Sequence, residues 1–434
     1  MKLKTLYVCS NCAYQATKWM GKCPECEAWN SFAEETVNVG KTDKISSVAR
    51  RLTTEKAVSI LNVGAIKERA KTGIEEFDLV AGGGIVDGSL ILLSGEPGIG
   101  KSTLTMQILD KMAAQKGSVL YVTGEESVEQ VSARAKRLGA AHENIKLLYE
   151  TNLENIIAAV ESEKPEFLVL DSIQVMASEA IPGMAGAISQ VRYVTESIMS
   201  LIKTKKISTL LIGHVNKEGN LAGPKVLEHL VDAVFLLEGE RDQSLRLLRS
   251  VKNRYGTVNE VGMFEMDSNG LQELRNPAEK ILQNRPVNSF GSCLTITMEG
   301  NRPILMEVQA LVNTSPFGYP KRAASGFDRN RLELLIAVIE KHTDLSLSDK
   351  DVYINITGGL HLKDPAADLA VCMAIASSLK KKPLAENLVF FGEIGLAGEI
   401  RKTVQEDSRR KAIKKIAMLP AENTKFLRNS IAQI

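Results

Sequence analysis

The chain has 434 residues, of which 44% are hydrophobic and 24% charged, and its formal net charge is +2. This length predicts two or three domains, and the small net charge means that any surface for nucleic acid must be local. No apolar run approaches the ~18 residues of a membrane span and the N-terminus has no signal-peptide pattern, so we expect a cytoplasmic protein without a membrane partner.

Two C-x-x-C pairs stand near the N-terminus: Cys9 and Cys12, then Cys23 and Cys26. In a reducing compartment they favour one tetrahedral Zn²⁺ over disulfides, and so short a segment would depend on the metal to fold. A thioredoxin-like redox site would instead need one pair in a βαβ context. We predict a zinc ribbon over 1–33, with Trp19 and Trp29 able to pack against it, and a polar linker over 34–62.

The stretch from Gly95 to Thr103 matches the phosphate-binding pattern G-x-x-x-x-G-K-[ST]. It lies between an apolar strand pattern and apolar residues at helical spacing, so backbone N–H groups and a helix N-terminus would face an anion. Lys101 would reach the β- and γ-phosphates of ATP, and the Ser102 hydroxyl would hold Mg²⁺. The predicted nucleotide-binding residues are Gly95, Glu96, Pro97, Gly98, Ile99, Gly100, Lys101, Ser102 and Thr103.

From Thr72 onward, short apolar runs alternate with helical patterns. This alternation predicts an α/β domain with a doubly wound, mostly parallel sheet, which we assign to residues 63–275. The strands are expected at 90–94, 119–123, 167–171, 208–213, 233–237 and 245–251. Ligands bind beyond the carboxyl ends of such strands, so polar residues at those ends are candidates for catalysis.

Strand 119–123 runs into two glutamates, Glu125 and Glu126, both candidate catalytic residues. A carboxylate there can orient the water that attacks the γ-phosphate, and we assign this role to Glu125. The alternative is a capped helix start, because Ser127 and Gln130 fit a capping box. Both interpretations can hold, since Glu125 precedes the cap.

Strand 167–171 ends in Asp171, a Walker-B pattern whose carboxylate would support the Mg²⁺ shell together with Ser102. His214 follows the next predicted strand and is either a structural histidine or a sensor of the γ-phosphate. Two glycine-containing loops follow these strands, at 177–188 and 216–225. They are either plain surface loops or function-bearing loops on a rigid scaffold.

The composition changes near residue 276, and no second P-loop follows. A mixed α/β domain over 276–434 is predicted from strand-like runs at 292–298, 304–312, 352–357 and 388–394 and helical patterns at 329–341 and 366–379. Cys293 and Cys372 have apolar neighbours and are predicted core residues. A solvated helix face, or alternatively a nucleic-acid contact, is predicted for the basic run Arg409-Arg410-Lys411 with Lys414 and Lys415.

Together these features resemble the RadA (Sms) family of bacterial DNA-repair proteins. The resemblance rests on the four-cysteine ribbon, the RecA-like ATPase with Gly95–Thr103, and a C-terminal segment that looks like the proteolytic domain of Lon. It also rests on Lys252-Asn253-Arg254-Tyr255-Gly256, which matches the family signature K-N-R-F-G with Tyr in place of Phe. The segment after Pro420 is shorter than the family leads us to expect.

The family implies a hexameric ring that hydrolyses ATP on single-stranded and branched DNA and promotes branch migration together with RecA. By similarity, Lys252 and Arg254 would be catalytic residues that reach the γ-phosphate bound to the neighbouring subunit. The loops 177–188 and 216–225 would line the central channel and contact the DNA backbone.

Two other functions stay open. The Lon-like end suggests an ATP-dependent protease, but Ala366 stands where its nucleophilic Ser is expected and the expected Lys position falls near Asp407. A RecA-fold ATPase switch that acts on protein partners, of the circadian-clock kinase type, also carries paired glutamates. The zinc ribbon and the signature Lys252–Gly256 argue against the switch, so we expect a DNA-dependent ATPase.

Overall fold

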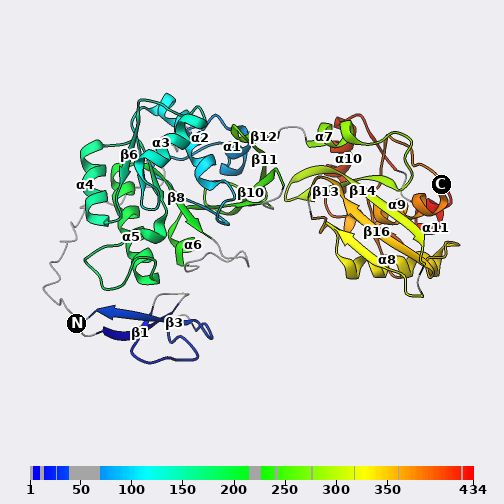
Figure 1. Ribbon diagram of the computed structural model, residues 1–434, viewed down its shortest axis with the longest axis horizontal. Coiled ribbons are helices and arrows are strands. Elements are labelled where there is room, and N and C mark those ends of the chain that lie inside the picture. Colours follow the sequence, from blue (N-terminus) through cyan, green and yellow to red (C-terminus); the bar gives the residue numbers. More distant parts are fainter. Residues whose placement is uncertain are drawn as a thin grey trace, which may run out of the picture. The chain divides into compact units, whose positions relative to one another are not determined.

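The computed structural model describes residues 3–9, 14–25, 27–38, 69–214, 226–239, 243–274, 277–316, 318–359, 361–421 and 424–434. It divides the chain into two compact units, Met1–Glu273 and Leu274–Ile434 (Figure 1). Within the described ranges, every helix is too short or too polar to cross a bilayer.

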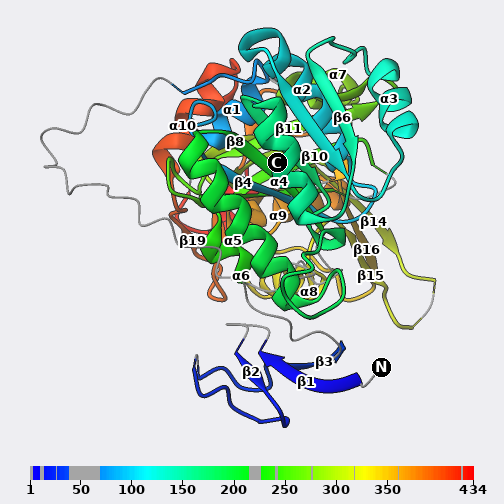
Figure 2. The ribbon, with the colours of Figure 1, turned by 90° about the vertical axis from the view of Figure 1, so that its left-hand side faces the viewer.

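The N-terminal segment forms a small antiparallel sheet in the order β2–β1–β3, with strands β1 (Leu3–Cys9), β2 (Gln15–Ala16) and β3 (Phe32–Asn38) (Figure 2). Its described buried side chains are Val8, Cys9, Cys23 and Ser31. So small a buried set cannot stabilise a fold by itself, which fits a metal-dependent ribbon. Trp19 and Trp29 are 55% and 73% exposed, and the rings of both lie beside Gly21, two residues before Cys23.

A nine-stranded sheet organises the rest of the first unit, in the order β12-β11-β10-β9-β4-β8-β7-β5-β6. Six strands are parallel: β4 (Leu90–Gly95), β5 (Val119–Thr123), β6 (Ile145–Tyr149), β7 (Phe167–Asp171), β8 (Ser208–His214) and β9 (Ala233–Glu238). An antiparallel extension follows, made of β10 (Leu245–Asn253), β11 (Val261–Asp267) and β12 (Gly270–Glu273). The predicted doubly wound, mostly parallel sheet is confirmed, while β6, β11 and β12 were not predicted.

Helices cover both faces of this sheet. One face packs against α1 (Glu75–Ala81), α2 (Lys101–Lys116) and α3 (Val128–Arg137), and the other against α4 (Leu153–Glu163), α5 (Ile188–Lys205) and α6 (Val226–Leu230). In β7, Phe167 and Val169 lie in the first core while Leu168 and Leu170 lie in the second. Because side chains alternate along a strand, Asp171 faces the side of α2.

The second unit is a mixed α/β domain with a sheet in the order β15-β16-β14-β13-β17-β20. Its strands are β13 (Ser292–Glu299), β14 (Arg302–Thr314), β15 (Arg322–Ser325), β16 (Lys350–Ile356), β17 (Leu388–Val389) and β20 (Leu419–Pro420), with a separate pair, β18 (Glu393–Ile394) and β19 (Ile400–Arg401). Its helices are α7 (Pro277–Asn284), α8 (Arg329–His342), α9 (Asp368–Lys380), α10 (Glu406–Lys415) and α11 (Leu427–Ile431).

The strand predicted at 388–394 is wrong in its extent, because it consists of the two short strands β17 and β18 in different sheets. Between them the backbone changes partners: Phe390 N–H donates to Leu294 and Gly392 N–H donates to Ala366. Cys293 and Cys372 are fully buried, as predicted, and burial raises the pKa of both thiols.

Arg409 corrects the prediction of a solvated basic face on α10, because it is only 1% exposed. Its guanidinium donates to Asp364 Oδ2 at 2.6 Å and to the Ile296 carbonyl at 2.5 Å. The helical period explains the error: Arg409 and Ile413 are four residues apart and share the buried face of α10. The ion pair therefore fastens α10 to the turn that carries Asp364.

Replacing this guanidinium should destabilise the second unit. We expect Arg409→Ala to lower its free energy of unfolding by about 3–5 kcal/mol, because Asp364 would be left as an uncompensated, largely buried charge. Hydrogen exchange of 277–434 in the full chain, followed through a urea series, measures this loss. Arg410→Ala removes the half-exposed partner of Glu406 and should cost no more than about 1 kcal/mol. Equal losses in the two variants would contradict a structural role for the buried pair.

Candidate active site

The loop between β4 and α2 has the geometry of an anion-binding turn. Gly98 and Gly100 have φ values of 82° and 115°, in the left-handed region that glycine adopts at no steric cost. A Cβ on Gly100 would lie 2.5 Å from the terminal methyl of Met266. The chain then enters α2 at Lys101, so the N-terminus of this helix lies at the loop.

Lys101 is 4% exposed, and its ammonium is folded back onto the loop. It donates to the carbonyls of Gly95 at 2.9 Å and Glu96 at 3.0 Å. Burial lowers the pKa of Lys101 to about 8, although Asp171 and Glu125 act in the opposite direction. A phosphate group would supply an anion beside this buried ammonium and would favour its charged form.

Asp171 joins the end of β7 to the start of α2. Its Oδ2 accepts a hydrogen bond from the Ser102 hydroxyl at 3.0 Å, and the same atom accepts one from Tyr121. Burial raises the pKa of Asp171, while these two hydrogen bonds lower it. A hydroxyl beside a carboxylate is an oxygen donor set that suits Mg²⁺, so the two predicted magnesium residues are brought together.

The sequence patterns above did not single out Tyr121, although the alternation of side chains along strand 119–123 places it on the same face as Thr123. Thr123 pairs with Asp171 across β5 and β7, and Tyr121 lies two residues earlier on the same face. A polar side chain at position 121 therefore points toward the α2 face of the sheet, next to the Walker-B carboxylate of Asp171.

The predicted capping box at the start of α3 is confirmed. Ser127 Oγ accepts from the Gln130 N–H at 3.4 Å, and the Gln130 side chain accepts from the Ser127 N–H at 2.9 Å. Glu126, just before the cap, donates its N–H to Thr123 Oγ1 at 3.1 Å, and its carboxylate pairs with Arg134 on α3. Glu126 is therefore tied into the start of this helix.

Glu125 differs from Glu126, because it is exposed and its carboxylate accepts a hydrogen bond from the Ser172 hydroxyl. Ser172 directly follows Asp171, so Glu125 lies beside the end of β7. This arrangement suits the predicted role of Glu125 in orienting a water, which stays a prediction.

The register of the sheet pairs His214, the last residue of β8, with Gly95 at the start of the P-loop. The side chain of His214 and the loop 216–225 lie outside the described residues, so their predicted roles stay predictions. Loop 177–188 is described, and the buried Gln190 side chain donates to its Ser178 and Ile181 carbonyls, each at 3.0 Å. This loop has no Lys or Arg, so any contact with DNA would use backbone and apolar atoms.

Lys252 and Arg254 lie beside one another at the end of β10, and each has partners in its own chain. The Lys252 ammonium binds the Glu228 carbonyl and, at 2.9 Å, the Val231 carbonyl, which closes the end of α6. Arg254 Nη1 lies 3.3 Å from Asp232 Oδ1, and Lys203 Nζ lies 2.6 Å from Asp232 Oδ2. Within the single chain, both cations are therefore bound by oxygen atoms of their own subunit.

These cations also lie near the start of β4, whereas the P-loop follows the end of this strand. Lys252 pairs with Val234, which pairs with Leu92, and the Arg254 N–H binds Asp232, whose N–H binds Leu90. The P-loop starts at Gly95, which at 3.3 Å per residue lies about 10 Å further along the strand than Leu92 and about 17 Å further than Leu90. Lys252 and Arg254 are therefore placed away from their own nucleotide site.

The ribbon has half of the predicted zinc ligands within the described residues. Cys9 and Cys23, one from each pair, are fully buried, and Cys9 Sγ lies 3.2 Å from Ser31 Oγ. After Cys23 the chain turns back, and the Glu27 N–H binds its carbonyl at 2.9 Å. Cys12 and Cys26 lie outside the described residues, among which no three potential metal ligands are grouped. Two buried thiols, one of them at a tight turn, fit the predicted zinc ribbon.

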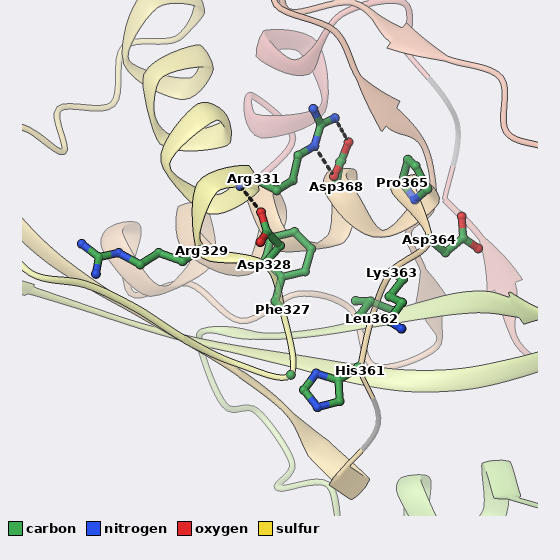
Figure 3. A pocket seen from close by; sticks show the side chains of 11 residues that line it. Phe327, Asp328, Arg329, Arg331, His361, Leu362, Lys363, Asp364, Pro365 and Asp368 are labelled. Carbon is green, nitrogen blue, oxygen red and sulfur yellow. Dashed lines mark hydrogen bonds and ion pairs between the residues drawn. The ribbon is translucent and has the colours of Figure 1, made fainter. Parts of the chain in front are cut away.

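A hollow of about 590 Å³ in the second unit lies where the sequence looks like Lon (Figure 3). Figure 3 shows Arg331 facing Asp368, and the Arg331 Nε is 3.1 Å from Asp368 Oδ1. Ala366 is buried in the 3₁₀ turn Pro365–Ala367, and Asp407 is exposed on α10. Among the described residues that line the hollow there is no Ser, Thr or Cys, so they supply no nucleophile for proteolysis.

Comparison with known proteins gives matches over most of the chain. Residues 70–151 match the family model of the ATPase KaiC, and residues 7–34 match a rubredoxin metal binding domain. A protein from Streptococcus pyogenes serotype M6, named DNA repair protein RadA, is 47% identical over 94% of this chain and 90% of its own. Proteins of the same name from Bacillus subtilis and Aquifex aeolicus are each 44% identical, over 97% of this chain and 93% of theirs. A solved structure of a KaiC-like protein from Pyrococcus horikoshii OT3 is 22% identical, covers 48% of this chain and 98% of that one, and gives a TM-score of 0.40.

Elemental analysis of the full chain should find one zinc ion per chain. Alanine substitution at any of positions 9, 12, 23 or 26 should release it, because each removes one of four thiolate ligands. Cys293→Ala removes a core thiol of the second unit and should retain the metal. Freshly purified wild-type protein without zinc would contradict the prediction.

Substitutions of Glu125 and Glu126 should have different effects on ATP hydrolysis. Glu125→Gln should bind ATP within a few-fold of wild type but lower kcat by about 10²–10⁴-fold, because the neutral amide cannot take a proton from the attacking water. Glu126→Gln weakens the pairing with Arg134 and should affect stability more than kcat. Nucleotide-binding titrations with single-turnover hydrolysis measure both effects. A collapse of kcat in Glu126→Gln alone would assign the base to Glu126.

Proposed function

Because the chain belongs to the RadA family of DNA repair proteins, we propose that its RecA-like ATPase domain is a DNA-dependent motor that works as a hexameric ring. It moves on single-stranded DNA and promotes branch migration of recombination intermediates, with the recombinase RecA as partner. The position of Lys252 and Arg254, away from their own P-loop, is the observation that carries this proposal. A ring explains it, because a neighbouring subunit can present these cations to the nucleotide.

Within one subunit the site prepares the γ-phosphate for attack. The P-loop backbone and Lys101 hold the phosphates, and Lys101 gives up its bonds to the Gly95 and Glu96 carbonyls. Bound Mg²⁺ neutralises charge on the phosphates, and Ser102 and Asp171 are the residues that would hold it. Glu125 orients the attacking water and takes its proton.

The neighbouring subunit completes the site through Lys252 and Arg254. Cations supplied in trans stabilise the charge that develops on the γ-phosphate and can be worth about 10³–10⁵ in rate. Asp232 keeps Lys203 as a partner if Arg254 turns toward the neighbour, so the change leaves no buried carboxylate without a cation. Hydrolysis is thereby coupled to the interface between subunits.

DNA lies along the loops 177–188 and 216–225. The second loop carries Lys217 and Lys225, which can contact phosphates, whereas the first contributes backbone and apolar atoms. Contacts with the phosphate backbone make affinity fall with salt and depend little on sequence.

The motor should respond to DNA. ATP hydrolysis by the full chain should rise in the presence of single-stranded and branched DNA, and fluorescence anisotropy across a salt series should show weaker binding at higher salt. The alternative, an ATPase switch directed at proteins, predicts hydrolysis that DNA does not change. Casein cleavage dependent on ATP would instead support the protease, which the Lon-like unit does not favour.

Mixing two inactive variants tests the action in trans. Lys101→Ala and Arg254→Ala should each abolish DNA-dependent hydrolysis, and their mixture should recover part of it, because some interfaces then contain both intact groups. The double variant Lys101→Ala/Arg254→Ala is the matched control, since it can restore neither parent. If mixed rings form, as seen by native mass spectrometry, and stay inactive, Arg254 acts within its own subunit or on DNA.

A further inference from the structure

Tyr121 lies at the bottom of the nucleotide site, where the proposed function gives it no role. It is fully buried on β5, between strands β7 and β6, among apolar side chains that include Val169 and Phe167. Packing alone would be served by phenylalanine, and a buried hydroxyl is costly unless it is hydrogen-bonded. Its acceptor is the Asp171 carboxylate, so the hydroxyl serves a functional group and not a backbone carbonyl.

The Tyr121 and Ser102 hydroxyls share one acceptor atom, Asp171 Oδ2. Two donors from different elements, β5 and α2, fix the rotation of the carboxylate about its Cβ–Cγ bond. Neither bond uses Oδ1. The carboxylate is therefore held in one orientation before a cation arrives.

The surroundings of Tyr121 connect this carboxylate to the second glutamate. Arg134 and Glu126 are close enough to act electrostatically on the Tyr121 hydroxyl, and these two side chains form an ion pair. The hydroxyl itself contacts Asp171, the proposed magnesium ligand, from a side chain that is fully buried. Groups behind a metal ligand orient it, and their loss typically weakens metal affinity or activity by about 10–100-fold.

We propose that Tyr121 is a positioning residue that orients Asp171 for the magnesium ion of the ATPase. The inference deepens the proposed site and rests on Asp171 serving that ion. Its contribution is to affinity for the cation, not to contacts with the nucleotide. Binding of nucleotide without magnesium should therefore be independent of the Tyr121 hydroxyl.

Tyr121→Phe removes one oxygen atom and tests this inference. Binding of a fluorescent ADP analogue to the full chain is titrated with Mg²⁺ and, separately, in EDTA. The Mg²⁺ concentration for half-maximal binding should rise about tenfold or more, while the affinity in EDTA stays unchanged. Tyr149→Phe, on the neighbouring strand β6, changes an exposed ring in the same way and should leave both values at the wild-type level.

A variant that binds Mg²⁺ like wild type but melts at a lower temperature would show that Tyr121 acts in packing alone, and would overturn the inference. Tyr121→Met, which lacks a hydroxyl but fills irregular space, replaces the Phe variant if that one does not fold. Asp171→Asn separates the two levels of the argument. If it loses the Mg²⁺ dependence while Tyr121→Phe keeps it, only the role of Tyr121 fails. If neither variant changes the Mg²⁺ dependence, the proposed magnesium site itself fails.

Discussion

The hydrogen bond between the Ser102 hydroxyl and the Asp171 carboxylate, 3.0 Å long, sets the requirements for the first unit. It can form only if β4 and β7 end at the same edge of one sheet, with α2 packed on the face toward which Asp171 points. Parallel strands meet the first condition, and the apolar side chains on that face meet the second. The two cores thus serve to bring two polar groups, 69 residues apart in the chain, into contact.

Local patterns predicted the parts of this site that depend on neighbours in sequence. The P-loop, the capping box of α3 and the strand that ends in Asp171 are each readable within a few residues. The sequence did not predict the partners of long polar side chains, because those partners come from distant segments of the chain. The basic run predicted a solvated Arg409, but the distant residues Ile296 and Asp364 bind its guanidinium. The ammonium of Lys252 likewise binds the Val231 carbonyl at the end of α6, which its neighbours in sequence do not indicate. For Tyr121, the alternation along the strand predicts the face of the sheet on which the side chain lies, but not that Asp171 accepts its hydrogen bond.

In the second unit, buried ion pairs occupy the region where a Lon-like protease would have its reacting groups. Asp364 is bound by Arg409, and Asp368 by Arg331, which also donates to the Ile394 carbonyl. Such pairs contribute little net stability, but breaking one leaves a buried charge that is costly. They fasten the segment around Ala366 to α10 and α8, and the described residues that line the hollow there include no Ser, Thr or Cys.

The amide of Gln190 has a consequence for how the first unit meets a ligand. By binding carbonyls of loop 177–188 from within α5, it leaves that loop little conformational freedom, although Met184 at its tip is 76% exposed. A segment already ordered loses less entropy on contact than one that must fold around its partner. Because the loop is bonded to α5, a small rotation of this helix would move the loop with it and would displace Met184 at the tip.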